Sequence, residues 1–261
     1  MKIPVMVSRA RVRGEEIRVV RPARGLARGV VLDLDAYLGA YPDREAAAVI
    51  GGLWLLAARS PRSLIHLPMR GNPPPAGAFG EGRRLDVALV PRAMQFAPSR
   101  RKQVRARLDA GRPQTVEPAG VGPGEGPDID HRARHHRENR DLFRQHVHAD
   151  TLFMTGTAKV FRETAGRLLD VAREGPGFVP GHPNHGHFCT EFHGLDKIPA
   201  PGAREIHVEY CTRWAAASGR PAGWDHMCTA GAVFEAGAGA PGRKRTAVTS
   251  RPIAKNAADQ R

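Results

Sequence analysis

The chain has few cysteines, few aromatic residues and no long apolar run, and each shortage excludes a class of protein. Three cysteines in 261 residues cannot form a disulfide framework, and an odd number is typical of a reducing compartment. The longest apolar run, 46–58, is too short to span a bilayer, and the N-terminus becomes charged before a signal-peptide core could form. We therefore expect a cytoplasmic protein that does not associate with membranes.

The net charge of +14 raises the question of a nucleic-acid partner. Only six of the 40 basic residues are lysine, a skew toward arginine that a GC-rich genome produces without selection for a ligand. Surfaces that bind nucleic acid usually combine basic side chains with aromatic ones, and aromatic residues make up only 6% of this chain. On composition alone, a nucleic-acid partner stays open but is not favoured.

Hydrophobic periodicity predicts an α+β fold with antiparallel or mixed sheets and helices packed on one face. Asp43 and Thr157 are of the residue types that cap helices, and an apolar stripe follows each of them. Each half of the chain then contains a strand, a helix and two strands in that order. The predicted strands are 2–8, 15–20, 30–34, 63–67, 85–90, 151–155, 185–192 and 204–210, and the predicted helices of the two halves are 44–58 and 158–173, the second ended by Gly175-Pro176.

The same pattern predicts two modules, 1–110 and 131–213. Between them, 111–130 lacks periodicity and is rich in glycine and proline, which is typical of a flexible linker. Residues 216–261 are mostly Ala, Gly, Pro and Arg, a composition that favours a disordered tail. A turn is expected through Tyr41-Pro42, a basic helix that Ser99 caps and that ends at Gly111, and a polar helix over 131–148.

The most distinctive segment is HGHFCTEFH, residues 185–193. Because side chains alternate across a strand, its histidines and cysteine share one face, and Phe188 and Phe192 share the other. The candidate metal ligands are His185, His187, Cys189 and, from the next strand, His207. Imidazole and thiolate suit zinc, but the spacing matches no compact zinc motif. The leading interpretation is therefore a solvated polar face without a cofactor, and a zinc site is the alternative.

A second candidate contact is the start of the basic helix. Arg100, Arg101 and Lys102 lie in its first turn, where cations oppose the helix dipole and exposed N–H groups favour anions. A bound phosphate or an acidic partner would resolve this conflict. We therefore expect these three residues to contact an anion or a partner, with arginine-rich surface drift as an equal alternative.

The segment VVLDLDAYL, residues 30–38, resembles the first motif of haloacid-dehalogenase-like phosphatases. In that family the first aspartate attacks phosphorus and the second is acid and base, which would be Asp33 and Asp35 here. Ala36-Tyr37 stands where the family has glycine and threonine, and no acidic pair follows a later strand to hold magnesium. We therefore interpret Asp33 and Asp35 as the end of a strand that enters a turn.

Three pieces between Thr151 and Tyr210 carry a further likeness: TLFMTGTAKVFRETAGRLLDVARE, the His-x-His strand HGHFC, and PGAREIHVEY. Together they resemble a family of small immunity proteins from bacterial polymorphic-toxin systems. Such proteins act by binding, so the resemblance implies a protein partner and no catalytic residues.

The sequence therefore favours a non-catalytic, cytoplasmic protein-binding role, immunity-like or regulatory. A metal-dependent hydrolase that uses His185, His187, Cys189 and His207 is the alternative, and a non-specific nucleic-acid binder comes third.

Overall fold

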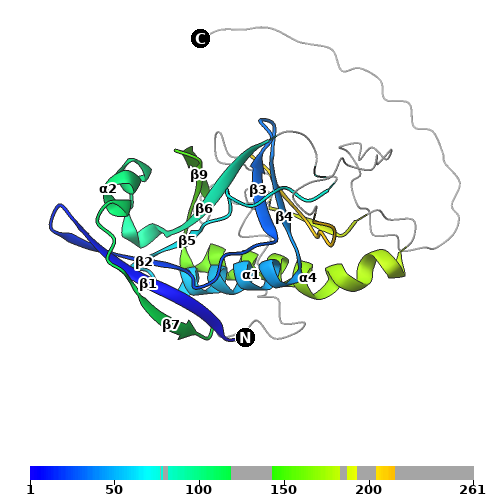
Figure 1. The fold of residues 1–261 in the computed structure, drawn as a ribbon, viewed down its shortest axis with the longest axis horizontal. Helices are drawn as coiled ribbons and strands as arrows, with labels where there is room; N and C mark the ends of the chain where they lie inside the picture. The colour runs from blue at the N-terminus through cyan, green and yellow to red at the C-terminus, as the bar shows by residue number, and fades with distance from the viewer. Residues whose placement is uncertain (77, 79–81, 119–142, 183–186, 193–203, 215–261) are drawn as a thin grey trace, which may run out of the picture. The chain divides into compact units, whose positions relative to one another are not determined.

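Alternating burial along the first two strands, nearly complete burial of the central strands and one buried stripe along each long helix produce a mixed sheet with two helices on one face (Figure 1). This α+β class is the predicted one. The computed structural model describes residues 1–76, 78, 82–118, 143–182, 187–192 and 204–214. All of them belong to one unit, Met1–Gly223.

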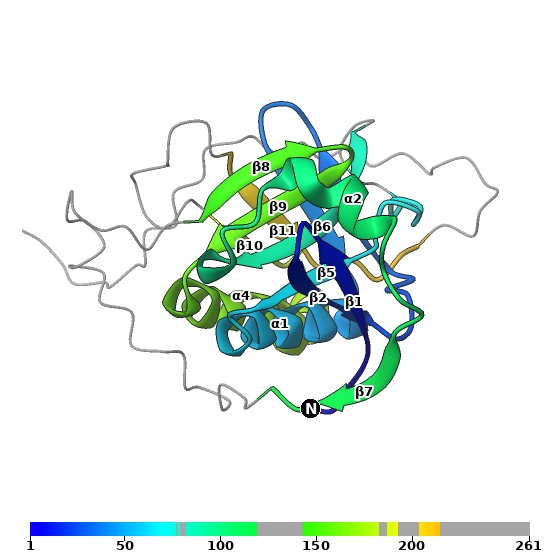
Figure 2. The same cartoon turned by 90° about the vertical axis from the view of Figure 1, so that its left-hand side faces the viewer.

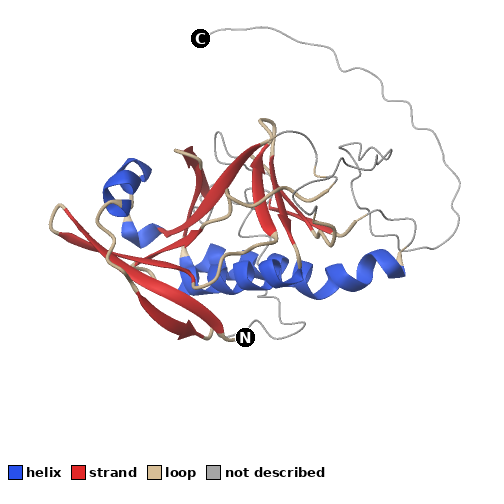
Figure 3. Cartoon of the chain, viewed as in Figure 1, coloured by secondary structure: helices blue, strands red, loops and turns tan. Residues whose placement is uncertain are grey.

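The described part of the chain contains eleven strands in one sheet (Figure 3). They are β1 (Ile3–Val12), β2 (Glu15–Pro22), β3 (Gly29–Asp33), β4 (Leu38–Pro42), β5 (Ser63–Leu67), β6 (Arg83–Pro91), β7 (Arg112–Val116), β8 (Arg144–His148), β9 (Thr151–Gly156), β10 (Cys189–Phe192) and β11 (Ile206–Glu209). Their order is β10-β11-β4-β3-β6-β5-β2-β1-β7, with β9 on β6 and β8 on β9. The sheet branches at β6, because its first residues pair with β3 and its later residues pair with β5 and β9.

Three α-helices complete the described elements: α1 (Arg44–Arg59), α2 (Arg101–Arg105) and α4 (Ala158–Gly181). Two of the three predicted caps, Asp43 and Thr157, are confirmed, whereas Ser99 lies inside the short 3₁₀ helix Pro98–Arg100 and α2 begins without a side-chain cap. The Asp43 carboxylate accepts a hydrogen bond from the Ala46 N–H at 2.8 Å, and the Thr157 hydroxyl accepts one from the Val160 N–H at 3.3 Å. Within the described residues, no helix combines the length and the apolar character that crossing a bilayer would require.

The main hydrophobic core lies between the sheet and the paired helices α1 and α4, which run side by side (Figure 2). Trp54 of α1 is at its centre. The Trp54 ring lies 5.9 Å from the rings of Phe143 and Phe161 and 5.8 Å from that of Phe192, and its Nε1 donates to the Thr164 hydroxyl at 2.9 Å. The halves that the sequence suggested as separate modules therefore contribute side chains to one core.

A second core lies on the opposite face, near the turn that joins β1 and β2. Val104 of α2 and Phe96 pack there against Val12 and Ile17 of the β1–β2 hairpin. The Phe96 ring stacks on that of Phe153 at 6.2 Å. The second core therefore packs against one face of the β1–β2 hairpin. The hairpin extends past the ends of α1 and α4, which leaves its other face beyond these helices (Figure 1).

Three segments predicted as turn, linker or helix are strands instead. Tyr41 and Pro42 end β4. Residues 112–116, predicted as linker, form β7. Almost all of its side chains are exposed, so its sequence shows no hydrophobic periodicity. Residues 144–148, predicted as the end of a polar helix, form β8, which alternates between exposed and half-buried positions. The rest of both segments, like the predicted tail 216–261, lies outside the described residues.

Two predicted helix boundaries were also wrong. α4 continues past Gly175 and Pro176 to Gly181. A Cβ on Gly175 would lie 2.4 Å from the Tyr210 ring, so this glycine serves close packing rather than helix termination. The basic helix ends at Arg105 and not at Gly111, because the Asp109 carboxylate accepts from the N–H groups of Arg9 at 2.9 Å and Gly111 at 3.0 Å, which is a turn rather than a helix.

Candidate metal centre

The predicted hairpin is confirmed: β10 and β11 pair antiparallel, and β11 lies parallel beside β4. Thr190 lies opposite Val208, and Phe192 opposite Ile206, so the aromatic and aliphatic side chains face the helices. The intervening pairs, in which Cys189 faces Glu209 and Glu191 faces His207, share the other face of the sheet. The alternation in the sequence therefore gave the correct division between apolar and polar faces.

Three of the four predicted ligands come together on the polar face. The ligand atoms of His187, Cys189 and His207 all lie within 4.8 Å of one another. The imidazole rings of His187 and His207 are 6.0 Å apart and inclined by 70°. His185 lies outside the described residues. Two nitrogen ligands and one sulfur ligand from adjacent strands can hold one transition-metal ion.

Acidic side chains surround His207 and were not predicted as ligands. Glu191, Glu205 and His207 form a second group within 4.8 Å, and the Glu209 Oε2 lies 3.9 Å from the His207 Nε2. Alternation along the two strands placed these carboxylates on the correct face, which was the signal available. Because both groups include His207, they describe one site with alternative ligands rather than two sites.

Burial changes the protonation of the site. It lowers the pKa of His207, and the neighbouring His187 lowers it further, whereas Glu191 opposes the change. Burial alone raises the pKa of Glu209 to about 7. The Glu209 Oε2 accepts no hydrogen bond within the described residues. Burial therefore favours the neutral forms of both the His207 imidazole and the Glu209 carboxyl.

Tyr41 covers one side of the group formed by His187, Cys189 and His207. The Cα partner of His207 on β4 is Gly39. A Cβ on Gly39 would lie 2.7 Å from the Tyr41 ring, which therefore folds back over this position and closes the sheet face beside His207. Tyr41 is itself buried, together with Val30 and Leu32 of β3. The cluster thus has an apolar wall on one side and solvent beside Cys189 on the other.

The structure places the phosphatase-like aspartates in a different role. The Asp33 carboxylate ends β3 as predicted and pairs with the Arg83 guanidinium at 3.0 Å and with that of Arg204. The hydrogen bond from Arg204 is the main cause that lowers the pKa of Asp33 to about 2. Asp35 follows in a turn with φ of 62°. Asp33 therefore anchors two strands through ion pairs, which supports its interpretation as a strand end.

The predicted anion contacts are engaged within the chain. Arg100 donates to the Glu15 carboxylate at 2.8 Å and to the Val12 carbonyl at 3.3 Å. Arg101 lies 3.5 Å from the buried Asp86 carboxylate. Lys102 is exposed. Two of the three cations are therefore neutralised by partners on β2 and β6.

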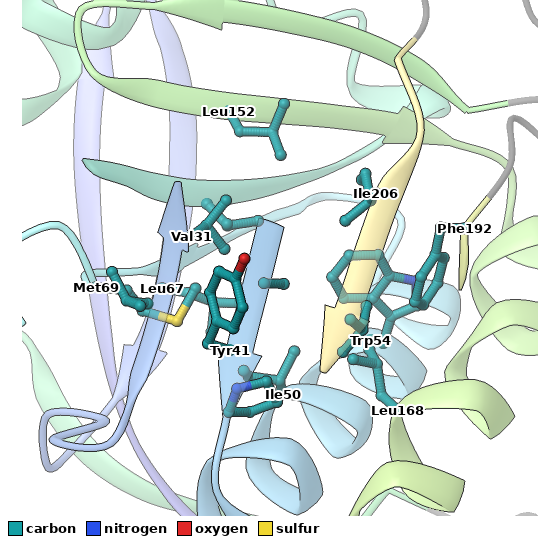
Figure 4. Close-up of a pocket in the computed structure, with 15 residues that line it drawn as sticks. Val31, Tyr41, Ile50, Trp54, Leu67, Met69, Leu152, Leu168, Phe192 and Ile206 are labelled. Atoms are coloured by element: carbon teal, nitrogen blue, oxygen red, sulfur yellow. The ribbon is translucent and has the colours of Figure 1, made fainter. Parts of the chain in front are cut away.

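An apolar cavity of about 40 Å³ lies on the opposite side of the hairpin, between the sheet and α1 and α4 (Figure 4). Phe192, Ile206 and Val208 line it together with Trp54 and Leu168 from the helices. A cavity of about 150 Å³ is known to bind benzene, and small apolar cavities stay dry. This cavity is therefore a packing gap rather than a substrate pocket.

No protein-family model, no curated protein and no solved structure matches the chain.

Proposed function

We propose that the protein binds a zinc-class divalent metal ion through His187, Cys189 and His207. The observation that carries the proposal is that the ligand atoms of these three side chains, from β10, the segment just before it and β11, lie within 4.8 Å of one another. Imidazole and thiolate select zinc over magnesium and calcium, which prefer oxygen ligands. The predicted cytoplasmic location, where reducing conditions preserve thiols, is part of this proposal.

Metal content and cobalt spectra test the proposal. Full-length protein loaded with zinc and then dialysed is expected to retain one ion per chain. His187→Ala, Cys189→Ser and His207→Ala are each expected to lose it, and the cobalt-loaded wild type is expected to show a thiolate-to-metal absorption band that Cys189→Ser lacks. His148→Ala, at an exposed histidine of β8, is the matched control and keeps the ion. Retention of the ion by all three cluster variants would exclude this site.

A metal-dependent hydrolase is the second candidate. Catalytic zinc sites use three protein ligands and leave the fourth position to water. The described residues supply three ligands of the predicted set, and the Glu209 carboxylate beside His207 lies where a general base is needed. Zinc-dependent hydrolysis of an activated ester that Glu209→Gln abolishes while the ion stays bound would support catalysis. Ion binding without hydrolysis would leave a structural or regulatory metal.

The predicted protein partner, immunity-like or regulatory, stays a separate proposal. It rests on the sequence resemblance of residues 151–210 and does not depend on a metal. Capture of a specific partner by the full chain, with and without chelator, distinguishes a partner that needs the ion from one that does not.

A further inference from the structure

A group of exposed arginines lies on the β1–β2 hairpin, at the opposite end of the strand order from the proposed metal centre. Arg9 and Arg11 project from β1 on the face opposite Ala10 and Val12, which are buried in the second core. Arg18 of β2 projects on the same face, since it lies directly opposite Arg9 in the antiparallel register. Three guanidinium groups therefore share one exposed face of two strands.

β7 extends this surface. Arg112 of β7 is the Cα partner of Val7, two residues before Arg9 on β1, and is exposed on the same face. We call Arg9, Arg11, Arg18 and Arg112 the basic face. It lies where the hairpin projects past the ends of α1 and α4 (Figure 1).

Little within the chain balances these charges. Glu16, the Cα partner of Arg11, lies 3.5 Å from Arg9, and the Asp109 carboxylate accepts from the Arg9 N–H at 2.9 Å. Arg11, Arg18 and Arg112 make no ion pair or side-chain hydrogen bond with the described residues. Like charges directly opposite each other on two strands destabilise the pair. A sheet that keeps Arg9 opposite Arg18 therefore favours an anionic ligand that neutralises both.

We propose that the basic face binds the phosphate backbone of double-stranded nucleic acid without reading its sequence. Arginines two residues apart on a strand are separated by about 6.8 Å, twice the 3.4 Å axial spacing of phosphates along one strand of a duplex. The face carries no aromatic side chain on which the bases of a single strand could stack. A duplex, with its higher density of phosphates, is therefore the better match. Counting charge along the sequence did not reveal this face, because its members come from three strands.

The test measures the anisotropy of a fluorescent 20-base-pair DNA of arbitrary sequence with the full-length protein at several salt concentrations. Arg11→Gln with Arg18→Gln is expected to weaken binding about tenfold or more at low salt and to reduce the slope of log affinity against log salt by about two. The matched control, Arg24→Gln with Arg44→Gln, removes two exposed arginines at the other end of β2 and at the start of α1 and is expected to bind like the wild type. The melting temperatures show that both variants fold.

Arg112→Gln gives an independent readout on the edge strand and is expected to reduce the salt slope by about one. Binding of the double variant within twofold of the wild type would overturn the proposal, as would an equal loss in the control. Labelled polyglutamate that binds more tightly than DNA, and loses that binding in the double variant, would assign the face to an acidic protein instead.

Discussion

Two buried carboxylates on the same sheet behave in opposite ways. Asp33 and Glu209 have side chains that are 8% and 16% exposed, and burial raises the pKa of each. Asp33 lies between two guanidinium groups, which more than offset burial and hold its pKa at about 2. Glu209 has the His207 imidazole beside it, the described residues place no guanidinium in contact with it, and burial raises its pKa to about 7.

The comparison distinguishes Asp33, a buried carboxylate whose charge the protein neutralises, from Glu209, whose charge the described residues do not neutralise. Arg83 and Arg204 supply the charge that Asp33 needs, so a ligand would add nothing there. At Glu209 the described chain supplies no such charge, and the Nε2 of His207, one of the proposed metal ligands, lies 3.9 Å from its Oε2. A divalent cation would do for Glu209 what the arginines do for Asp33.

The largest expected effect comes from adding a third buried acid that has neither arginine nor metal. Leu168→Asp places a carboxylate beside the apolar cavity, at a position that is 4% exposed in the main core. We expect a loss of roughly 3–5 kcal/mol, enough to prevent cooperative unfolding from being observed. Ala158→Asp, at the exposed first position of the same helix, is the control and leaves the melting temperature unchanged or higher. An unchanged melting temperature of Leu168→Asp would mean that the apolar stripe of α4 does not face the sheet.

The next largest effect is expected when the carboxylate of Asp33, which pairs with two arginines, is removed. Asp33→Asn is expected to cost about 2 kcal/mol, because Arg83 and Arg204 lose their shared partner, although Arg83 is half exposed. Asp35→Asn is the control, since asparagine tolerates the positive φ of this exposed position. Chemical denaturation measures both.

The pH dependence of the same pair has a definite sign. The folded pKa of Asp33 is lowered to about 2, so its stabilisation is complete above the unfolded pKa near 4 and is lost as the pH falls toward 2. The wild type should therefore lose about 1–2 kcal/mol more than Asp33→Asn between pH 5 and pH 2. Parallel curves for the two proteins would show that the ion pairs contribute nothing.

An effect of similar size and opposite sign is expected at Glu209. Its folded pKa is raised to about 7, so the folded state holds a proton that the unfolded state loses near pH 4.5, and stability falls as the pH rises between these values. In chelator, Glu209→Gln should gain about 1–2 kcal/mol on the wild type between pH 4 and pH 8. Glu45→Gln, at an exposed site, should gain nothing. If Glu209→Gln shows the same gain in stability when zinc is bound, Glu209 does not interact with the metal.

The smallest effect concerns the apolar side of the hairpin, where no charge is involved. Val31→Ile adds one methylene toward the cavity of about 40 Å³ and is expected to stabilise the protein by roughly 0.5–1 kcal/mol. Val7→Ile, at a buried position outside this cavity, is the control and should show no gain. A loss in Val31→Ile would mean that the cavity walls do not accommodate the added group.

The sequence predicted best what depends on local periodicity. The two long helices, their caps and eight of the strands follow from apolar spacing and capping residues, and alternation along HGHFCTEFH placed His187 and Cys189 on one face. The sequence could not predict β7, because its stability comes from pairing with β1 rather than from buried side chains. Nor could it show that β11 lies beside β4, which brings Glu209 near Tyr41 through a contact far apart in the chain.

The interleaving of the strands has a consequence for the newly made chain. When residues 1–110 have left the ribosome, β4 and β6 are complete but their partners β11 and β9 have not yet been made. Both strands then expose backbone N–H and C=O groups along an open edge, which is the kind of surface that pairs with other chains. At roughly 5–20 residues per second, the missing stretch to Glu209 takes about 5–20 s to synthesise. Translation that stalls in this window leaves a nascent chain that cannot close its own sheet.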